Sequence, residues 1–250
     1  MKNNFLNKPI ANVHSKSSSK SEISTQILYG EKFQIISRKK NWLKIKTKFD
    51  NYTGFIKQDK FINSHNPTHK VCITKSTIFK KKKSKFIKTK KNLYFSSTIE
   101  KLEIKKNYIR FDKNKWIRKK DTKNIKYTNK NYNKILRLFL NVNYLWGGKS
   151  ADGIDCSALI QLFFKFNGLF FPRDTKKQIK YCKKKTNKKF ESGDIIFWKG
   201  HVGLCLNKSQ FIHAYGPRKK VLIMNIRKTI EIISKTADLN IRKVSNIKKY

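Results

Sequence analysis

The chain has 250 residues, of which 38% are hydrophobic and 13% aromatic, so it can bury a core although 30% of its residues are charged. Its formal net charge is +45. Residues 1–120 contribute +25 and residues 121–250 contribute +20, so the excess forms no single basic tail. Lys, Asn, Ile and Phe are abundant together, as in lysine-biased proteomes encoded by AT-rich DNA. This distribution disfavours a dedicated nucleic-acid partner, although a basic surface attracts acidic substrates.

The four cysteines have no CxxC pairing, which argues against a zinc site and against a disulfide framework. Such cysteines suit a reducing compartment. The first 20 residues lack the apolar stretch of a secretory signal, and no later segment has the composition of a membrane span. We therefore expect a cytoplasmic protein without a membrane partner.

The N-terminal half has the pattern of short β-strands. The first 20 or so residues are polar, and we expect them to extend along the surface. A small barrel is expected over residues 1–65, followed by a linker at 63–68 and a second β module over 66–120. The expected strands are TQILYG, KFQIIS, WLKIKT and TGFIK in the barrel, and KVCITK, LYFSS, KLEIKK, YIRFD and KWIRKK in the module.

The lysine run KKKKSKFIKTKK (80–91) falls inside this second module. A dense charge run most often forms a solvated loop, and that is our expectation here. A contact with a polyanion is the alternative.

Residues 121–250 combine helical periodicity with later β-type runs. Apolar residues recur at helical spacing over 135–142 and again over 159–166, and PRDT (172–175) offers a helix start with Asp174 as N-cap. Helices followed by an antiparallel sheet predict an α+β domain. The later expected elements are strands at 194–198, 201–206, 211–215 and 221–226, a helix near 228–235 and a last strand near 240–244.

A reactive cysteine is predicted where this domain begins. A Gly-rich turn leads to Cys156 in the first turn of a helix, where unpaired N–H groups and the macrodipole favour a thiolate and suit an oxyanion. His201 opens one strand and His213 lies in the next, so a hairpin would make them neighbours. One imidazole would activate Cys156 and the other would orient the first. The pattern indicates a cysteine-nucleophile amide hydrolase.

Four segments carry a resemblance to a known family. YLWGGKSADGIDCSALIQ (144–161) resembles the nucleophile motif of the NlpC family of cell-wall cysteine peptidases, whose fold is papain-like. PRDTKKQ (172–178), ESGDIIFWKGHVGLCL (191–206) and FIHA (211–214) are similar, in order and spacing, to the segments that follow it. The resemblance covers roughly residues 125–250. Less specifically, the N-terminal half resembles the SH3-like barrels that precede this domain in bacterial peptidases.

The resemblance implies an activity and a set of site residues. The family cleaves peptide stems of peptidoglycan, commonly between γ-D-glutamate and a diamino acid, without a metal or organic cofactor. By position, Cys156 would be the nucleophile, His201 the general base and acid, and His213 the orienting residue. The positions that match the family's substrate-binding residues are Tyr144, Asp155 and Ser157, and Asp155 would face an α-amine of the substrate. Further candidates are Arg173, Glu31 and Tyr52.

The sequence leaves three functions open. A peptidase without a signal peptide would meet freed murein tripeptides in the cytoplasm, which makes murein recycling the expected function. A secreted hydrolase of intact wall is the alternative within the same chemistry. A basic polyanion-binding protein is the alternative from another class, and it predicts salt-sensitive binding that is independent of Cys156.

Overall fold

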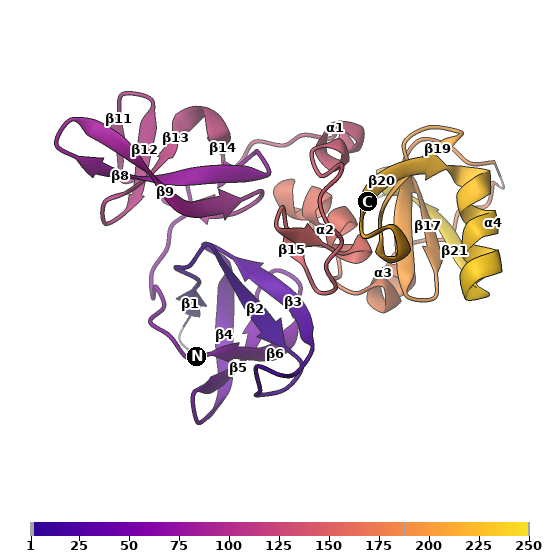
Figure 1. The fold of residues 1–250 in the computed structure, drawn as a ribbon, viewed down its shortest axis with the longest axis horizontal. Coiled ribbons are helices and arrows are strands. Elements are labelled where there is room, and N and C mark those ends of the chain that lie inside the picture. Colours follow the sequence, from indigo (N-terminus) through magenta and orange to yellow (C-terminus); the bar gives the residue numbers. More distant parts are fainter. Residues whose placement is uncertain (1–2, 188, 250) are drawn as a thin grey trace. The chain divides into compact units, whose positions relative to one another are not determined.

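The computed structural model describes residues 3–187 and 189–249 and divides the chain into two compact units. The first unit comprises residues 1–128 with 166–168, and the second comprises 129–165 with 169–250. Strands fill the first unit, while helices and an antiparallel sheet share the second (Figure 1). The α+β class expected from the sequence is confirmed. Within the described ranges, no helix has both the length and the apolar character that a membrane crossing requires.

The first barrel is a six-stranded sheet in the order β1-β4-β5-β6-β2-β3. Alternating strands such as Trp42–Thr47 turn one face inward, and seven fully or almost fully buried apolar side chains, among them Phe33 and Ile45, form its core. The strands are β1 Asn3–Phe5, β2 Ile10–His14, β3 Ile23–Leu28, β4 Lys32–Lys39, β5 Trp42–Thr47 and β6 Thr53–Lys57.

The expectation that the first 20 residues extend along the surface is wrong for most of this segment. β2 pairs with β3 from Ile10↔Leu28 onward, and β1 pairs with β4. Leu6 and Val13 are completely buried in the barrel core. Two apolar side chains among polar neighbours are enough to anchor this segment, because the backbone hydrogen bonds to β3 and β4 are independent of side-chain polarity.

The second β module contains a three-stranded sheet, β10-β7-β14, and a five-stranded sheet, β11-β12-β13-β8-β9. Its apolar core includes Ile78, Leu93 and Phe111, together with Tyr29 from the first barrel. The strands are β7 His69–Val71, β8 Lys75–Lys82, β9 Lys85–Tyr94, β10 Thr98–Ile99, β11 Glu103–Lys105, β12 Tyr108–Asp112, β13 Lys115–Arg118 and β14 Thr122–Asn124; the short helix η1 spans Lys119–Asp121.

The lysine run does not form the expected solvated loop. β8 and β9 form a hairpin whose ladder continues to Lys82↔Lys85 at its tip. Phe86 stacks on Tyr108 at 4.0 Å between ring centroids and contacts Trp116 edge-on. These aromatic contacts hold the hairpin although most of its lysines are exposed, since a charged side chain on the outer face of a strand stays solvated.

The module also extends beyond the expected boundary at residue 120. β14 pairs with β7, including Thr122↔Val71, and therefore belongs to the module. The first unit continues to Thr128.

The second unit is built on the antiparallel sheet β20-β19-β18-β17-β21. Every residue of β17 is buried, and Ile226 and Ile233 of α4 pack against Ile196 and Trp198 of that strand. α4 runs along the sheet at the yellow end of the chain (Figure 1). The elements are α1 Tyr132–Arg137, β15 Lys149–Ser150, β16 Gly153–Ile154, α2 Cys156–Phe166, α3 Thr175–Tyr181, β17 Asp194–Trp198, β18 His201–Cys205, β19 Gln210–Tyr215, η2 Gly216–Arg218, β20 Lys220–Asn225, α4 Ile226–Ala237, β21 Lys243–Asn246 and η3 Ile247–Lys249.

Most elements of this unit lie where the sequence pattern placed them, but the first helix is shorter. α1 ends at Arg137, and Leu138 is 41% exposed instead of facing the core. Asn141 has a positive φ of 65°, and its N–H donates to Val221 of β20. Tertiary pairing with the sheet therefore ends a helix that local periodicity alone would continue.

Candidate active site

The turn before α2 fixes Cys156 as the first residue of that helix. Asp155 precedes it and acts as the N-cap, since its Oδ1 accepts a hydrogen bond from Ala158 N at 2.8 Å. Its Oδ2 accepts from Gly147 N at 3.1 Å. The Gly-rich segment and the helix start are thus joined through one carboxylate, which sets the position of the neighbouring thiol.

Arg173 holds this carboxylate from the other side. Its Nη2 lies 2.6 Å from Asp155 Oδ2 and its Nη1 lies 3.0 Å from Oδ1, a bidentate pair between side chains that are 1% and 9% exposed. Arg173 Nη1 also donates to Ser157 Oγ at 2.8 Å. Asp155, Ser157 and Arg173 therefore form one buried hydrogen-bonded group.

This group bears on three of the residues that the family resemblance offered for substrate binding. The carboxylate oxygens of Asp155 already accept five hydrogen bonds within the chain. The guanidinium of Arg173 pairs with Asp155, so a substrate carboxylate would have to share it. Contacts of Asp155, Ser157 and Arg173 with a substrate stay predictions, and their structural role is to hold the turn that carries Cys156.

The hairpin of β17 and β18 approaches the thiol at its turn. Gly200 has a φ of +75°, a conformation that side chains with a Cβ rarely adopt. Its carbonyl oxygen lies 3.9 Å from Cys156 Sγ, and His201 follows it directly as the first residue of β18. The turn thus places His201 directly after the residue whose carbonyl oxygen contacts Cys156.

The two histidines form a hydrogen-bonded pair across neighbouring strands. His201 Nε2 lies 2.9 Å from Nδ1 of His213 in β19. His213 is completely buried, and its ring stacks on Tyr215 at 4.7 Å with a 13° angle between planes. Phe211 contacts the same imidazole edge-on, at 4.9 Å between ring centroids. The packing holds the His213 ring in one orientation, which in turn orients His201.

The hydrogen bond also determines which nitrogen of His201 can meet the thiol. Because Nε2 is engaged by His213, Nδ1 is the nitrogen left to accept a proton. A neutral His201 that accepts at Nδ1 must carry its hydrogen on Nε2 and donate it to His213 Nδ1. His213 then carries its own hydrogen on Nε2, which has no hydrogen-bond partner among the described residues.

Burial controls the protonation of all three side chains. It raises the pKa of the Cys156 thiol to about 12, with the nearby Asp155 acting in the same direction, and lowers the pKa of His201 to about 4. Burial and the neighbouring His201 lower the pKa of His213 well below its ordinary value. These shifts favour a neutral thiol on Cys156 and neutral imidazoles on both histidines at neutral pH. The preference for a thiolate expected from the helix N-terminus is outweighed by burial.

Tyr144 lies close to Cys156 and Asp155, and its contact with the glutamyl portion of a substrate stays a prediction. Its pKa is raised by burial, and the proximity of Cys156 and Asp155 adds to the effect. Glu31 and Tyr52 belong to the first unit, and the Glu31 carboxylate accepts a hydrogen bond from Leu28 N within its own turn. Their contact with a substrate stays a prediction.

Sequence reasoning gave no role to Thr175 or Gln178, although both lie in the PRDTKKQ segment. A hydrogen bond from the Thr175 side chain opposes the rise in the pKa of Cys156. Gln178 is completely buried, and its Nε2 donates to Ser157 O at 3.0 Å and to Pro172 O at 2.8 Å. The start of α3 is thereby tied to the first turn of α2.

A thiol at a helix N-terminus, an imidazole on the residue that follows its Gly200 contact and a second imidazole hydrogen-bonded to the first match the components of a cysteine peptidase. Their α+β framework agrees with that class. Residues 141–236 match the NlpC/P60 family, and residues 11–60 match the bacterial SH3 domain. The chain is thus a cysteine peptidase with an NlpC/P60 domain that follows a bacterial SH3 domain.

Named relatives and solved structures agree with this assignment. The chain is 26% identical over 231 residues to gamma-D-glutamyl-L-lysine dipeptidyl-peptidase of Bacillus subtilis. This match covers 83% of the chain and 77% of the relative. It is 39% identical over 72 residues to dipeptidyl-peptidase 6 of Lysinibacillus sphaericus, a match that covers 28% of this chain and 27% of that protein. An NlpC/P60 family protein from Bacillus cereus ATCC 10987 superposes with a TM-score of 0.74 at 18% identity, over 90% of this chain and 94% of that one. At this identity the structural likeness concerns the fold.

Proposed function

We propose that the protein hydrolyses the bond between γ-D-glutamate and the diamino acid of peptidoglycan stem peptides, and that its substrate is the free tripeptide L-Ala-γ-D-Glu-diaminopimelate. The observation that carries the proposal is the placement of Cys156 and the His201–His213 pair around one turn. The names of the two dipeptidyl-peptidases that the chain resembles support the bond and the size of the substrate.

The acylation step follows from the protonation states. Cys156 Sγ attacks the γ-carbonyl carbon of the glutamyl residue while His201 Nδ1 accepts the thiol proton, so nucleophile and base act together. The imidazolium that forms on His201 donates its Nε2–H to His213 Nδ1, which stays an acceptor because burial keeps His213 neutral. The N-terminal end of α2 faces the oxyanion of the tetrahedral intermediate.

Collapse of this intermediate breaks the C–N bond. His201 returns its proton to the leaving amine of the diamino acid, and the glutamyl group remains on Cys156 as a thioester. A water molecule then attacks the thioester carbonyl while His201 accepts its proton, and the same proton is returned to the departing thiolate. L-Ala-D-Glu is released and the resting thiol is restored.

Mass-spectrometric product analysis tests this proposal. Purified protein is incubated with L-Ala-γ-D-Glu-meso-diaminopimelate, with the lysine tripeptide and with the N-acetylated diaminopimelate peptide, beside a Cys156→Ala control. Release of L-Ala-D-Glu by the wild type only, with the acetylated peptide spared, supports a dipeptidyl-peptidase that requires a free amine. If the wild type cleaved none of these peptides more than the Cys156→Ala control does, the proposed activity would be overturned.

The same assay separates recycling from wall remodelling. Relatives in this family include a murein DD-endopeptidase/LD-carboxypeptidase of Escherichia coli, 34% identical over 79 residues and matched over 42% of its length. Cleavage of the acetylated peptide or of intact peptidoglycan would keep the chemistry and favour a secreted hydrolase.

We propose that the protein acts in the cytoplasm. Immunodetection of the native protein in culture supernatant or wall fractions would contradict this location.

A further inference from the structure

A cavity of about 540 Å³ lies within the first unit, outside the peptidase site. Its volume falls in the range of small-molecule binding pockets. Its apolar lining comes from Pro9 and from Tyr29, Ile78 and Phe111, three core residues of the second β module that expose only 2–4% of their surface. Tyr29 and Phe111 contact each other edge-on at 5.2 Å, so two packed aromatic rings form part of its wall.

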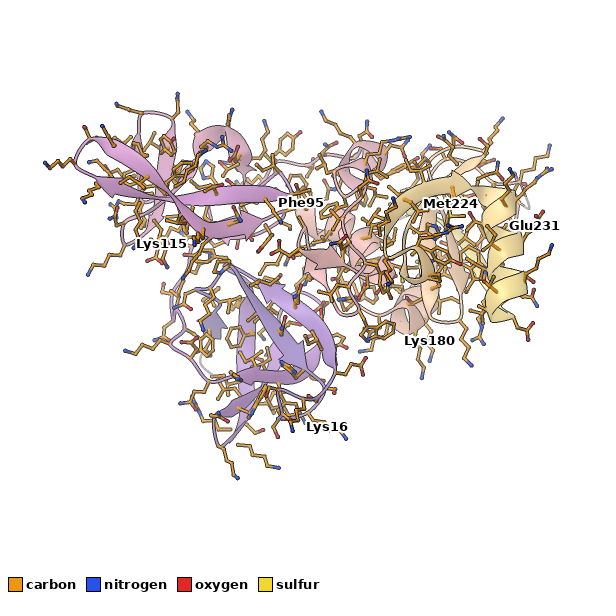
Figure 2. All side chains as sticks on the ribbon, in the orientation of Figure 1. Lys16, Phe95, Lys115, Lys180, Met224 and Glu231 are labelled. Carbon is orange, nitrogen blue, oxygen red and sulfur yellow. The ribbon has the colours of Figure 1, made fainter. Side chains whose placement is uncertain are left out.

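Lysines surround this apolar lining. Lys80, Lys90 and Lys91 of the β8–β9 hairpin line the cavity, and none of them has an ion-pair partner among the described residues. Lys115, labelled in Figure 2, also lines it and is paired with Asp112. The one carboxylate in the lining, Asp59, pairs with Lys8. The cavity therefore keeps an uncompensated positive charge.

A β-bulge brings Lys90 and Lys91 to the cavity together. Between the pairs Thr77↔Asn92 and Phe79↔Lys88, β8 has one residue and β9 has three, residues 89–91. Successive side chains of a regular strand point to opposite faces, yet all three of these residues line the cavity. Thr89 fixes the irregularity, since its Oγ1 donates to Ile78 O at 2.7 Å and accepts from Lys91 N at 3.2 Å.

The charge around the cavity exceeds what an even distribution would give. Residues 66–128 contain 21 Lys and Arg but only four Asp and Glu, although nitrogen-tipped side chains project from the whole ribbon (Figure 2). Clustered ammonium groups repel each other, and an anion among them would relieve that repulsion. An aromatic and aliphatic lining beside them favours a flat or apolar body on the same molecule.

From the cavity, the bulge and the unpaired lysines we propose that the first unit binds a small anion, a carboxylate or phosphate attached to a flat apolar body. The anionic group would lie against Lys80, Lys90 and Lys91, and the body against Tyr29 and Phe111. This site is independent of Cys156, so it gives the protein a ligand besides its peptide substrate.

Dye binding to the full-length protein tests the proposal. The probe is 8-anilinonaphthalene-1-sulfonate, a flat aromatic anion, beside N-phenyl-1-naphthylamine, which has the same rings without the sulfonate. We expect the anionic dye to bind about tenfold more tightly than the neutral one, and this preference to shrink in high salt. Phenyl phosphate and phenylacetate as competitors show whether phosphate or carboxylate is preferred.

Two double variants with the same change of net charge give the decisive comparison. Lys90→Glu/Lys91→Glu removes two lysines of the cavity, whereas Lys82→Glu/Lys88→Glu alters the same hairpin outside the lining. We expect the first to weaken binding of the anionic dye about tenfold and the second to change it less than about twofold. Thermal unfolding followed by circular dichroism, unchanged in both variants, shows that the strands of the first unit still fold. Equal effects of the two variants, or equal affinity for the neutral dye, would overturn the proposal.

Discussion

The reactive thiol is controlled by two opposing influences on one residue. The end of a helix favours the thiolate, and burial together with the Asp155 carboxylate favours the thiol. Burial has the larger effect on the pKa, and in the proposed mechanism Cys156 therefore loses its proton to His201 during attack. This differs from a site that holds a preformed thiolate–imidazolium pair.

Alkylation of Cys156 should therefore follow the raised pKa. A pKa raised to about 12 leaves little thiolate at neutral pH, and that fraction grows about tenfold with each pH unit until the pKa is reached. We expect the iodoacetamide rate at Cys156, followed by peptide mass spectrometry, to climb steadily from pH 7 to pH 10. A plateau that begins below pH 7 would instead show a stable thiolate in the resting enzyme.

The acceptor nitrogen of His213 is expected to matter more than its charge. His213→Leu removes the partner of His201 Nε2, while His213→Asn can supply an amide oxygen as acceptor. We predict that the leucine variant loses about 10²–10⁴-fold in kcat and that the asparagine variant recovers a large part of this loss, with KM nearly unchanged in both. Steady-state kinetics on the cleaved tripeptide measure the effect, and equal losses in the two variants would argue for a purely structural role.

The sequence located these side chains but not their surroundings. Cys156 and His201 are recognisable because each lies beside a glycine-containing turn next to an apolar element, a signal that is local. The pair of Asp155 with Arg173 joins residues 18 positions apart, and only the tertiary fold shows that it is buried. Protonation states could not be predicted either, because they depend on burial.

At the level of elements, the start of α2 is held by the segment that leads into α3. Arg173 forms an ion pair with the N-cap residue Asp155, and Gln178 donates a hydrogen bond to the carbonyl oxygen of Ser157 in the first turn of α2. Neither contact involves the reacting atoms. Together they keep the end of the helix that begins at Cys156 at a fixed place against the Gly200 turn.

Removing the guanidinium should unfold or loosen this arrangement. Arg173→Leu leaves Asp155 as an uncompensated buried carboxylate, which costs about 3–5 kcal/mol of stability in comparable pairs. Arg173→Lys keeps the charge but loses the bidentate geometry, and its loss should be smaller. Urea unfolding compares the two variants with Lys176→Leu, an exposed position in α3, as control. If Arg173→Leu lowered the free energy of unfolding by less than about 1 kcal/mol, the Arg173–Asp155 pair would not stabilise this turn.

Elements were predictable where apolar residues follow one period and less so where tertiary pairing decides. The strands over 194–198 and 211–215 read directly as β-type runs. The β8–β9 hairpin could not be predicted from its lysine-rich sequence, because it is stabilised by the packing of Phe86 on Tyr108, which is 22 residues away in the chain. The same reason explains why β2 was missed and α1 was expected to be longer.

At the scale of the whole molecule, the charge of +45 is spread over both units, and Figure 2 shows cationic side chains projecting throughout. A surface of one dominant sign attracts substrates of the opposite sign over distances up to the Debye length. The dense charge of residues 66–128 adds a local effect to this general one. Peptide substrates that differ in charge should therefore respond differently to salt.

The diaminopimelate and lysine tripeptides provide that comparison, since they differ by one carboxylate on the diamino acid. We predict that kcat/KM for the diaminopimelate peptide falls about threefold as NaCl is raised toward 0.3 M, because salt screens the attraction, and that kcat changes little. For the lysine peptide the fall should be smaller. Sodium chloride is compared with sucrose of equal osmolality to separate screening from solvent effects. Equal salt responses of the two peptides would show that the basic surface does not contribute to substrate capture.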